Sequence, residues 1–158
     1  MSDDQHLLRH MLAVIAYRGG NVLRNAPADF GATRIRDDTR SAVEILAHIN
    51  DVLYWGLTKV QGDPVLNERP AGKWREQLDD FYDLLARFDE TLRSMDELPC
   101  SPARLLAGPL ADTLTHIGQL ATLRKLAGSP VRGESYFAAD IETGRVGPDQ
   151  AAPVKEKR

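Results

Sequence analysis

The sequence has few of the features that mark several large classes of protein. A single cysteine, Cys100, among 158 residues excludes an internal disulfide, as is usual in the reducing cytosol. Aromatic residues make up 6% of the chain, and 20 Lys and Arg face 23 Asp and Glu, for a net charge of −3. Because the chain has neither a basic excess nor a basic face interleaved with aromatic residues, we expect no nucleic-acid partner.

Long apolar runs are also missing. No stretch approaches the roughly eighteen consecutive apolar residues of a membrane-spanning helix. The N-terminal segment, residues 1–4, is acidic where a secretory or mitochondrial signal would be basic. We therefore expect a cytoplasmic protein without a membrane partner. Its 158 residues, 42% of them hydrophobic, suit one domain with a packed core.

Apolar residues recur at spacings of three and four along four stretches, which predicts an all-α protein, a four-helix bundle. The predicted helices cover residues 4–23, 42–61, 74–95 and 109–126, with one further turn at 103–107. Ser41 stands three residues before Glu44, as in a capping box. Pro109 suits the first position of the last helix, and Gly128 followed by Pro130 ends it.

The helical pattern ends at the C-terminal side of this last helix. Glycine and proline interrupt residues 131–158, and the apolar pieces there are short. We predict one bundle, residues 1–130, followed by an irregular, non-helical tail, residues 131–158. We expect the tail to pack on the bundle or on a neighbouring subunit and to fray at 155–158.

The strongest candidate site combines residues of two predicted helices. Asp112 and His116 stand four residues apart in the last helix, so their Cβ atoms lie about 5–6 Å apart and both can reach one ion. His48, in the middle of the second helix, can supply a third ligand. Two imidazoles and one carboxylate suit zinc, iron(II), nickel or manganese. The spacing alone equally fits a solvated polar stripe on the last helix and a hydrogen-bonded histidine at the core edge.

Two segments resemble the DinB/YfiT-like superfamily. Residues 44–53, EILAHINDVL, are similar to its first histidine motif, and residues 112–124, DTLTHIGQLATLR, to its H-x-x-x-H-x-G-Q element. The resemblance covers about residues 7–128. It implies a DinB-like four-helix bundle whose divalent metal is held by three histidines, one from the second helix and two from the fourth. His48 and His116 match two of these positions, and Asp112 stands in place of the remaining histidine.

The resemblance implies a divalent metal cofactor. We expect zinc first, with nickel, iron or manganese as alternatives. Asp112 remains a plausible ligand in place of the histidine, because a carboxylate binds the same metals. Asp51 lies one helical turn from His48, and Gln119 lies one turn from His116. Both are candidate catalytic residues that orient a ligand or transfer a proton. The other interpretation of these two side chains is that they are ordinary polar surface residues.

Characterised relatives include thiol S-transferases that use bacillithiol and a mycothiol-dependent isomerase. The resemblance therefore implies a metal-dependent enzyme that activates a low-molecular-weight thiol or water, as a thiol S-transferase or a hydrolase of a small molecule. The alternative is a non-catalytic helical dimer or ligand-sensing protein that keeps the fold. A homodimer is expected in either case.

Other residues that can bind a metal or react have simpler interpretations. His6 and His10 are also four residues apart, but His6 lies near a helix end and we expect no metal there. Cys100 lies in a proline-rich loop without an evident base, which favours an unreactive thiol. A small basic cluster, which we expect to form a solvated loop balanced by Asp37 and Asp38, consists of Arg34, Arg36 and Arg40.

Overall fold

All regular structure in the computed structural model, which describes residues 1–155, is helical apart from one isolated β-bridge. The four long helices are α1 (Asp3–Leu23), α2 (Ala42–Val60), α3 (Trp74–Ser94) and α5 (Ala111–Leu126). Shorter pieces are a 3-10 turn, η1 (Phe30–Ala32), a helical turn, α4 (Pro102–Leu105), and a π-helical segment, η2 (Leu106–Leu110). The all-α prediction is confirmed. Of the predicted frayed end, residues 156–158 lie outside the described part of the chain.

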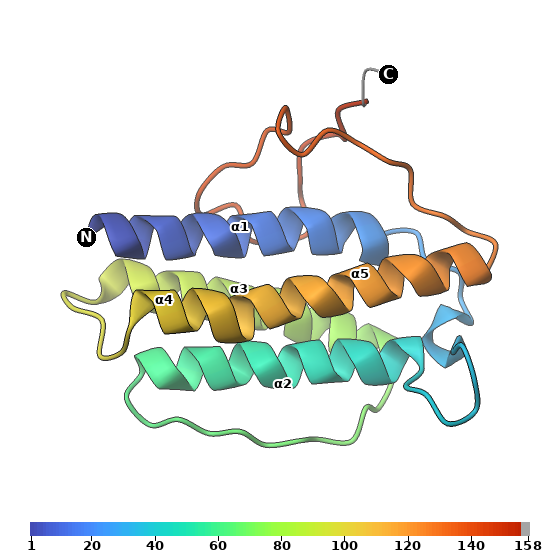
Figure 1. The fold of residues 1–158 in the computed structure, drawn as a ribbon, viewed down its shortest axis with the longest axis horizontal. Coiled ribbons are helices and arrows are strands. Elements are labelled where there is room, and N and C mark those ends of the chain that lie inside the picture. Colours follow the sequence, from blue (N-terminus) through green and yellow to red (C-terminus); the bar gives the residue numbers. More distant parts are fainter. Residues whose placement is uncertain (156–158) are drawn as a thin grey trace.

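Helices α2 and α5, on which the predicted metal ligands lie, pack against each other (Figure 1). Helices α1 and α5 run in one direction, and α2 and α3 run in the other. Both α1 and α2 pack against α3 and α5, so α1 and α2 lie diagonally opposite each other. Because α2 and α3 are parallel, the loop of residues 61–73 between them returns along the whole length of the bundle. This loop covers the outer side of α2.

Close packing fixes the spacing between α2 and the last helix. Phe88 of α3 is fully buried in the bundle centre. A Cβ atom added at Gly56 of α2 would lie 2.9 Å from the Phe88 ring and 3.1 Å from Pro109. Only a glycine at this position therefore allows α3 and η2 to approach α2 so closely. At the other end of α2, Glu44 accepts a hydrogen bond of 2.6 Å from the Ser41 N–H, as the capping box predicts.

The last helix begins earlier than the sequence indicates. Predicted to start at Pro109, it starts at Pro102, after Ser101, whose hydroxyl caps the first turn. Pro109 lies inside the helix, in η2. A proline ring collides with the carbonyl four residues earlier in an α-helix, and the wider π-helical turn relieves that collision. The helix therefore continues through the proline into α5, where Asp112 and His116 lie on successive turns.

The tail lies on the bundle of its own chain. Residues 131–155 contain no helix and run along the outer side of α1 (Figure 1). Glu134 is buried there and accepts hydrogen bonds from Tyr17 and Asn21 of α1. Val146 is buried as well. No helix within residues 1–155 combines the length and hydrophobicity needed to cross a membrane.

Candidate metal centre

The structure brings the three predicted metal ligands together. His48 comes from the middle of α2, and Asp112 and His116 come from the first two turns of α5. One potential ligand atom from each residue lies within 4.8 Å of the other two. The His116 Nε2 atom is 3.5 Å from Asp112 Oδ1, and the two imidazole rings meet edge to face with centroids 4.6 Å apart.

These distances are close to those of a bound ion. Ligand atoms at about 2.0–2.2 Å from a tetrahedral zinc lie roughly 3.4 Å from one another. The observed Nε2 to Oδ1 distance of 3.5 Å already matches this value. Small side-chain rotations of His48 would complete the set. The donor types, two imidazole nitrogens and a carboxylate, fit a divalent transition metal with a position left for a further ligand.

Gln119 sets the orientation of one imidazole. Its Oε1 atom lies 2.9 Å from His116 Nδ1, one turn along α5. Because a carboxamide oxygen can only accept a hydrogen bond, we assign the proton of neutral His116 to Nδ1. The lone pair on Nε2 then faces Asp112. A hydrogen bond from the second ring nitrogen is the usual way in which a protein fixes a metal-binding histidine.

The electrostatic surroundings keep the other imidazole neutral. Burial is the main cause that lowers the pKa of His48, and the positive charge of Arg40 lowers it further. Asp112 and Asp51 act in the opposite direction but do not reverse the shift. His48 therefore stays deprotonated at neutral pH, which is the form that binds a metal.

The site opens to solvent on the side of α5. The side chain of His116 is only 12% exposed, whereas that of Asp112 is 48% exposed. Asp112 faces His116 instead of forming a surface ion pair with a basic residue of α5. In the described part of the chain, no other three His, Cys, Asp or Glu side chains come close enough to hold an ion.

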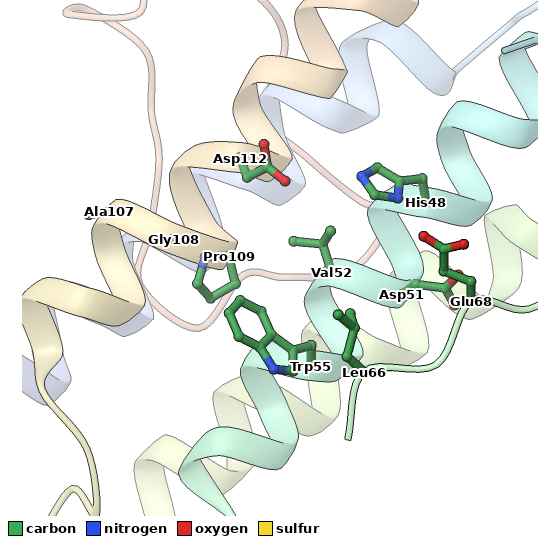
Figure 2. A pocket seen from close by; sticks show the side chains of 10 residues that line it. All are labelled: His48, Asp51, Val52, Trp55, Leu66, Glu68, Ala107, Gly108, Pro109 and Asp112. Carbon is green, nitrogen blue, oxygen red and sulfur yellow. The ribbon is translucent and has the colours of Figure 1, made fainter. Parts of the chain in front are cut away.

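A pocket of about 410 Å³ adjoins the ligands (Figure 2). His48 and Asp112 face each other across its upper part, from α2 and α5. Trp55 and Leu66 line the lower part, and the Glu68 side chain lies next to His48. The pocket therefore combines an apolar wall with polar groups around the candidate metal position, as is usual for small-molecule sites.

Asp51 has a different environment from the one the sequence suggests. It is buried and lines the same pocket as His48. Both of its carboxylate oxygens accept hydrogen bonds from Arg69, one from the Nε atom at 2.9 Å and one from the backbone N–H at 3.1 Å. Asp51 therefore holds the loop of residues 61–73 against α2. The proton-transfer role predicted for it stays a prediction.

Sequence reasoning missed several residues of this pocket. Trp55 lies seven residues after His48, which is two helical turns along the same face of α2, so its position was readable from the spacing. Leu66 and Glu68 belong to a loop without a motif, and no pattern in the sequence indicates that this loop runs back past His48. The sequence therefore indicates which residues of α2 line the pocket, but it does not indicate that the loop of residues 61–73 lines it as well.

The other candidates of the sequence do not form a site. His10 contacts Thr143 of the tail at 3.1 Å, and His6 is exposed, so this pair does not converge with a third ligand among residues 1–155. Burial raises the pKa of the Cys100 thiol, which lowers its thiolate fraction. Arg124 is buried and donates hydrogen bonds to backbone carbonyls at the end of α1.

Comparisons with known proteins identify no relative of this chain. The chain matches no family model, no curated protein and no solved structure.

Proposed function

We propose that this chain is a metal-dependent enzyme of the DinB-like type that activates a low-molecular-weight thiol or water. His48, Asp112 and His116 would hold the divalent metal, for which zinc is the first candidate and nickel, iron and manganese are the alternatives. One observation carries the proposal: three ligand atoms from two helices lie within 4.8 Å of one another beside a pocket of about 410 Å³.

The ligand set decides which chemistry is available. A divalent cation held by these three ligands would keep an open position, where it would lower the pKa of a bound thiol or water. Two neutral histidines and one carboxylate compensate a single charge, so the site keeps a net charge of +1 and favours an anionic ligand. The reaction would then be the attack of the thiol sulfur or water oxygen on an electrophilic small molecule, as in a thiol S-transferase or a hydrolase. The thiol or water would lose its proton, one bond would form to the electrophilic atom, and the bond from that atom to its leaving group would break.

The remaining residues of the pocket have roles that follow from their contacts. Gln119 orients His116 through the hydrogen bond to Nδ1. Glu68 lies beside His48 without an ion-pair partner in the described residues, so its carboxylate is available to take the proton that the thiol or water loses. Trp55 and Leu66 line the lower part of the pocket and offer an apolar surface to the electrophile.

A second candidate function is a non-catalytic helical dimer or ligand-sensing protein. The exposure of Asp112, 48% of its side chain, favours this alternative, because a ligand so open to water is held less firmly. The docking of the tail on α1 of the same chain removes one argument for it, since the tail need not wrap a partner. We keep a cytoplasmic homodimer as part of both proposals.

Metal analysis of the purified full chain tests the site. We expect about one zinc ion per chain after supplementation and dialysis, as a single three-ligand site requires. His48→Ala and His116→Ala should lose this metal. His6→Ala is the matched control, because this histidine is exposed on α1 away from the cluster, and it should bind as much metal as the unmodified chain.

Two results would reject the proposal. The first is an unmodified chain that retains no divalent metal after supplementation. The second is metal that remains bound at full stoichiometry in both His48→Ala and His116→Ala. If the site is confirmed, turnover of a chromogenic electrophile with a thiol, compared with turnover in water alone, separates the transferase from the hydrolase.

A further inference from the structure

Arg40 lies beside the candidate metal centre without a partner. It directly precedes Ser41, the residue that caps α2. It lines a polar hollow of about 290 Å³ that also touches His48 and Glu68, and therefore borders the pocket described above. On its other side, Arg40 lines a hollow of about 470 Å³ that includes Gln119.

Arg69, the other basic residue that lines this polar hollow, is already paired, and so is Arg34, whose partner Glu44 lines it. Arg34 contacts Glu44 at 3.4 Å, and Arg69 contacts Asp51 at 2.9 Å. Arg40 forms no hydrogen bond, ion pair or ring contact with any of residues 1–155. Its guanidinium group therefore keeps all five N–H donors free for a ligand.

Arg40 is also close enough to act on the metal ligands. Arg40 and His48 line the same hollow, so the positive charge of the guanidinium group acts there. The same field reaches a ligand bound next to His48. A negative group on that ligand would gain from this field and from hydrogen bonds to the guanidinium.

The negative charges nearby restrict which anion fits. Three carboxylates line the same hollow as Arg40: Glu68, and Glu44 and Asp51, which pair with Arg34 and Arg69. Asp112 faces His48 in the adjoining pocket. A dianion such as a phosphate monoester would be repelled by these carboxylates, whereas a single carboxylate is repelled less. The planar guanidinium also matches the geometry of a carboxylate, to which it can donate two parallel hydrogen bonds. The surroundings of Arg40 thus favour a carboxylate over a phosphate.

We propose that Arg40 is a specificity-determining residue, which binds a carboxylate on the thiol whose sulfur reaches the metal centre. The inference rests on the proposed function and names its substrate class: a small thiol that carries a carboxylate. The thiol then occupies the polar hollow on the Arg40 side of His48. The apolar wall of Trp55 and Leu66 on the opposite side remains free for the electrophile.

The test measures thiol binding and does not depend on turnover. The full chain is loaded with Co²⁺, and the sulfur-to-cobalt absorption band in the near ultraviolet is titrated with two matched series of probes. One series consists of ω-mercaptocarboxylates of increasing length, and the other of ω-mercaptoalcohols of the same lengths. We expect the best carboxylate to bind about fivefold to tenfold more tightly than its matched alcohol, as one exposed charge-assisted contact allows.

Two variants assign that preference to a residue. Arg40→Gln should bind both series equally, with the affinity of the alcohols unchanged, which also shows that the variant is folded. Arg36→Gln removes the same charge from the same loop, where Arg36 pairs with Asp38 outside the hollows, and should keep the preference. No preference in the unmodified chain, or a preference that survives in Arg40→Gln, would overturn the inference.

The outcomes separate this inference from the proposed function. If Co²⁺ does not bind, the proposed function fails and the inference fails with it. If Co²⁺ binds without a sulfur band for either series, the inference and the thiol-activating form of the proposed function fail, and only the hydrolase remains. If both series give bands of equal affinity, the thiol-activating centre is supported, and only the role of Arg40 is rejected.

Discussion

Tyr17 offers a direct measurement of how firmly the tail is held on the bundle. Its side chain is fully buried, and its hydroxyl donates to Glu134 Oε2 at 2.5 Å. Asn21 donates to the other oxygen of the same carboxylate. In Tyr17→Phe the ring stays in place, packed edge to face against Tyr136 at a centroid distance of 6.5 Å. The substitution therefore removes one hydrogen bond to a buried charge and little else.

The structure gives the size and the pH dependence of this effect. A hydrogen bond to a charged group contributes about 1.5–3 kcal/mol, so we expect Tyr17→Phe to lower the free energy of unfolding by about 2 kcal/mol at neutral pH. Burial, followed by the hydrogen bond to Glu134, raises the pKa of Tyr17 to about 12. The unfolded chain loses this proton near pH 10, as a free tyrosine does.

The sign of the pH effect follows from these two values. Because the pKa is higher in the folded state, the stabilisation by the Tyr17 hydroxyl is complete below about pH 10 and is lost as the pH rises through about 12. Two pKa units correspond to about 2.7 kcal/mol, the same order as the hydrogen bond. The stability gap between the unmodified chain and Tyr17→Phe should therefore close over this interval.

Urea unfolding of the two proteins, followed by circular dichroism at a series of pH values, measures this gap. Tyr54→Phe is the control, because the Tyr54 hydroxyl makes no hydrogen bond within the described chain, and its gap should stay small at every pH. The reasoning is refuted if Tyr17→Phe is as stable as the unmodified chain near neutral pH. It is also refuted if the gap does not shrink between about pH 10 and pH 12.

Three further perturbations follow from single contacts. Gly56→Ala places a methyl group 2.9 Å from the Phe88 ring and 3.1 Å from Pro109, so overpacking should cost about 1–3 kcal/mol in urea unfolding. Gln119→Ala removes the acceptor for His116 Nδ1, and zinc affinity in a chelator competition should fall about 10- to 100-fold. Zinc at about 100 times its dissociation constant should stabilise the fold by about 2.7 kcal/mol and raise Tm by about 5–10 °C.

Each of these perturbations has a matched control. Gly118→Ala adds a methyl group that meets no atom within 4 Å, so this variant should not be destabilised. Gln119→Ala should keep its metal-free stability within about 0.5 kcal/mol, because the side chain is exposed. His48→Ala should abolish the zinc-dependent rise in Tm. Equal destabilisation by both glycine variants, unchanged zinc affinity, or a Tm rise that survives in His48→Ala would contradict the respective prediction.

The positions of the first three helices were predictable because their signals are local. Apolar spacing over residues 4–23 and 74–95 predicted α1 and α3 to within one residue at each end. The pair Ser41 and Glu44 located the start of α2, since a capping box reports the helix end itself. These patterns depend only on residues close together in the sequence, so they can be interpreted without knowledge of the fold.

Two features of the fold were not predictable because they depend on residues far apart in the chain. Pro109 is accommodated inside a helix by a π-helical turn, and the close approach of Gly56 in α2 holds that turn in place. The loop of residues 61–73 returns along the bundle because α2 and α3 are parallel. Local sequence patterns indicate neither the direction of a helix relative to its neighbours nor the path of a loop.

The candidate site also has a part that the sequence predicts and a part that it does not. His48, Asp112 and His116 followed from helical spacing and from the motifs that carry the resemblance, and the structure places them together. The engagement of Asp51 by Arg69, by contrast, depends on the returning loop. Spacing on a helix therefore indicated the ligands, while the walls of the pocket required the three-dimensional arrangement.

The position of the bound metal tests the central claim most directly. A crystal of the zinc-loaded full chain, measured on both sides of the zinc absorption edge, locates the ion by anomalous scattering. We predict one peak between α2 and α5, about 2.0–2.2 Å from His48, Asp112 and His116. A zinc peak that lies elsewhere on the chain, or a zinc-loaded crystal without a peak near these three side chains, would contradict the account.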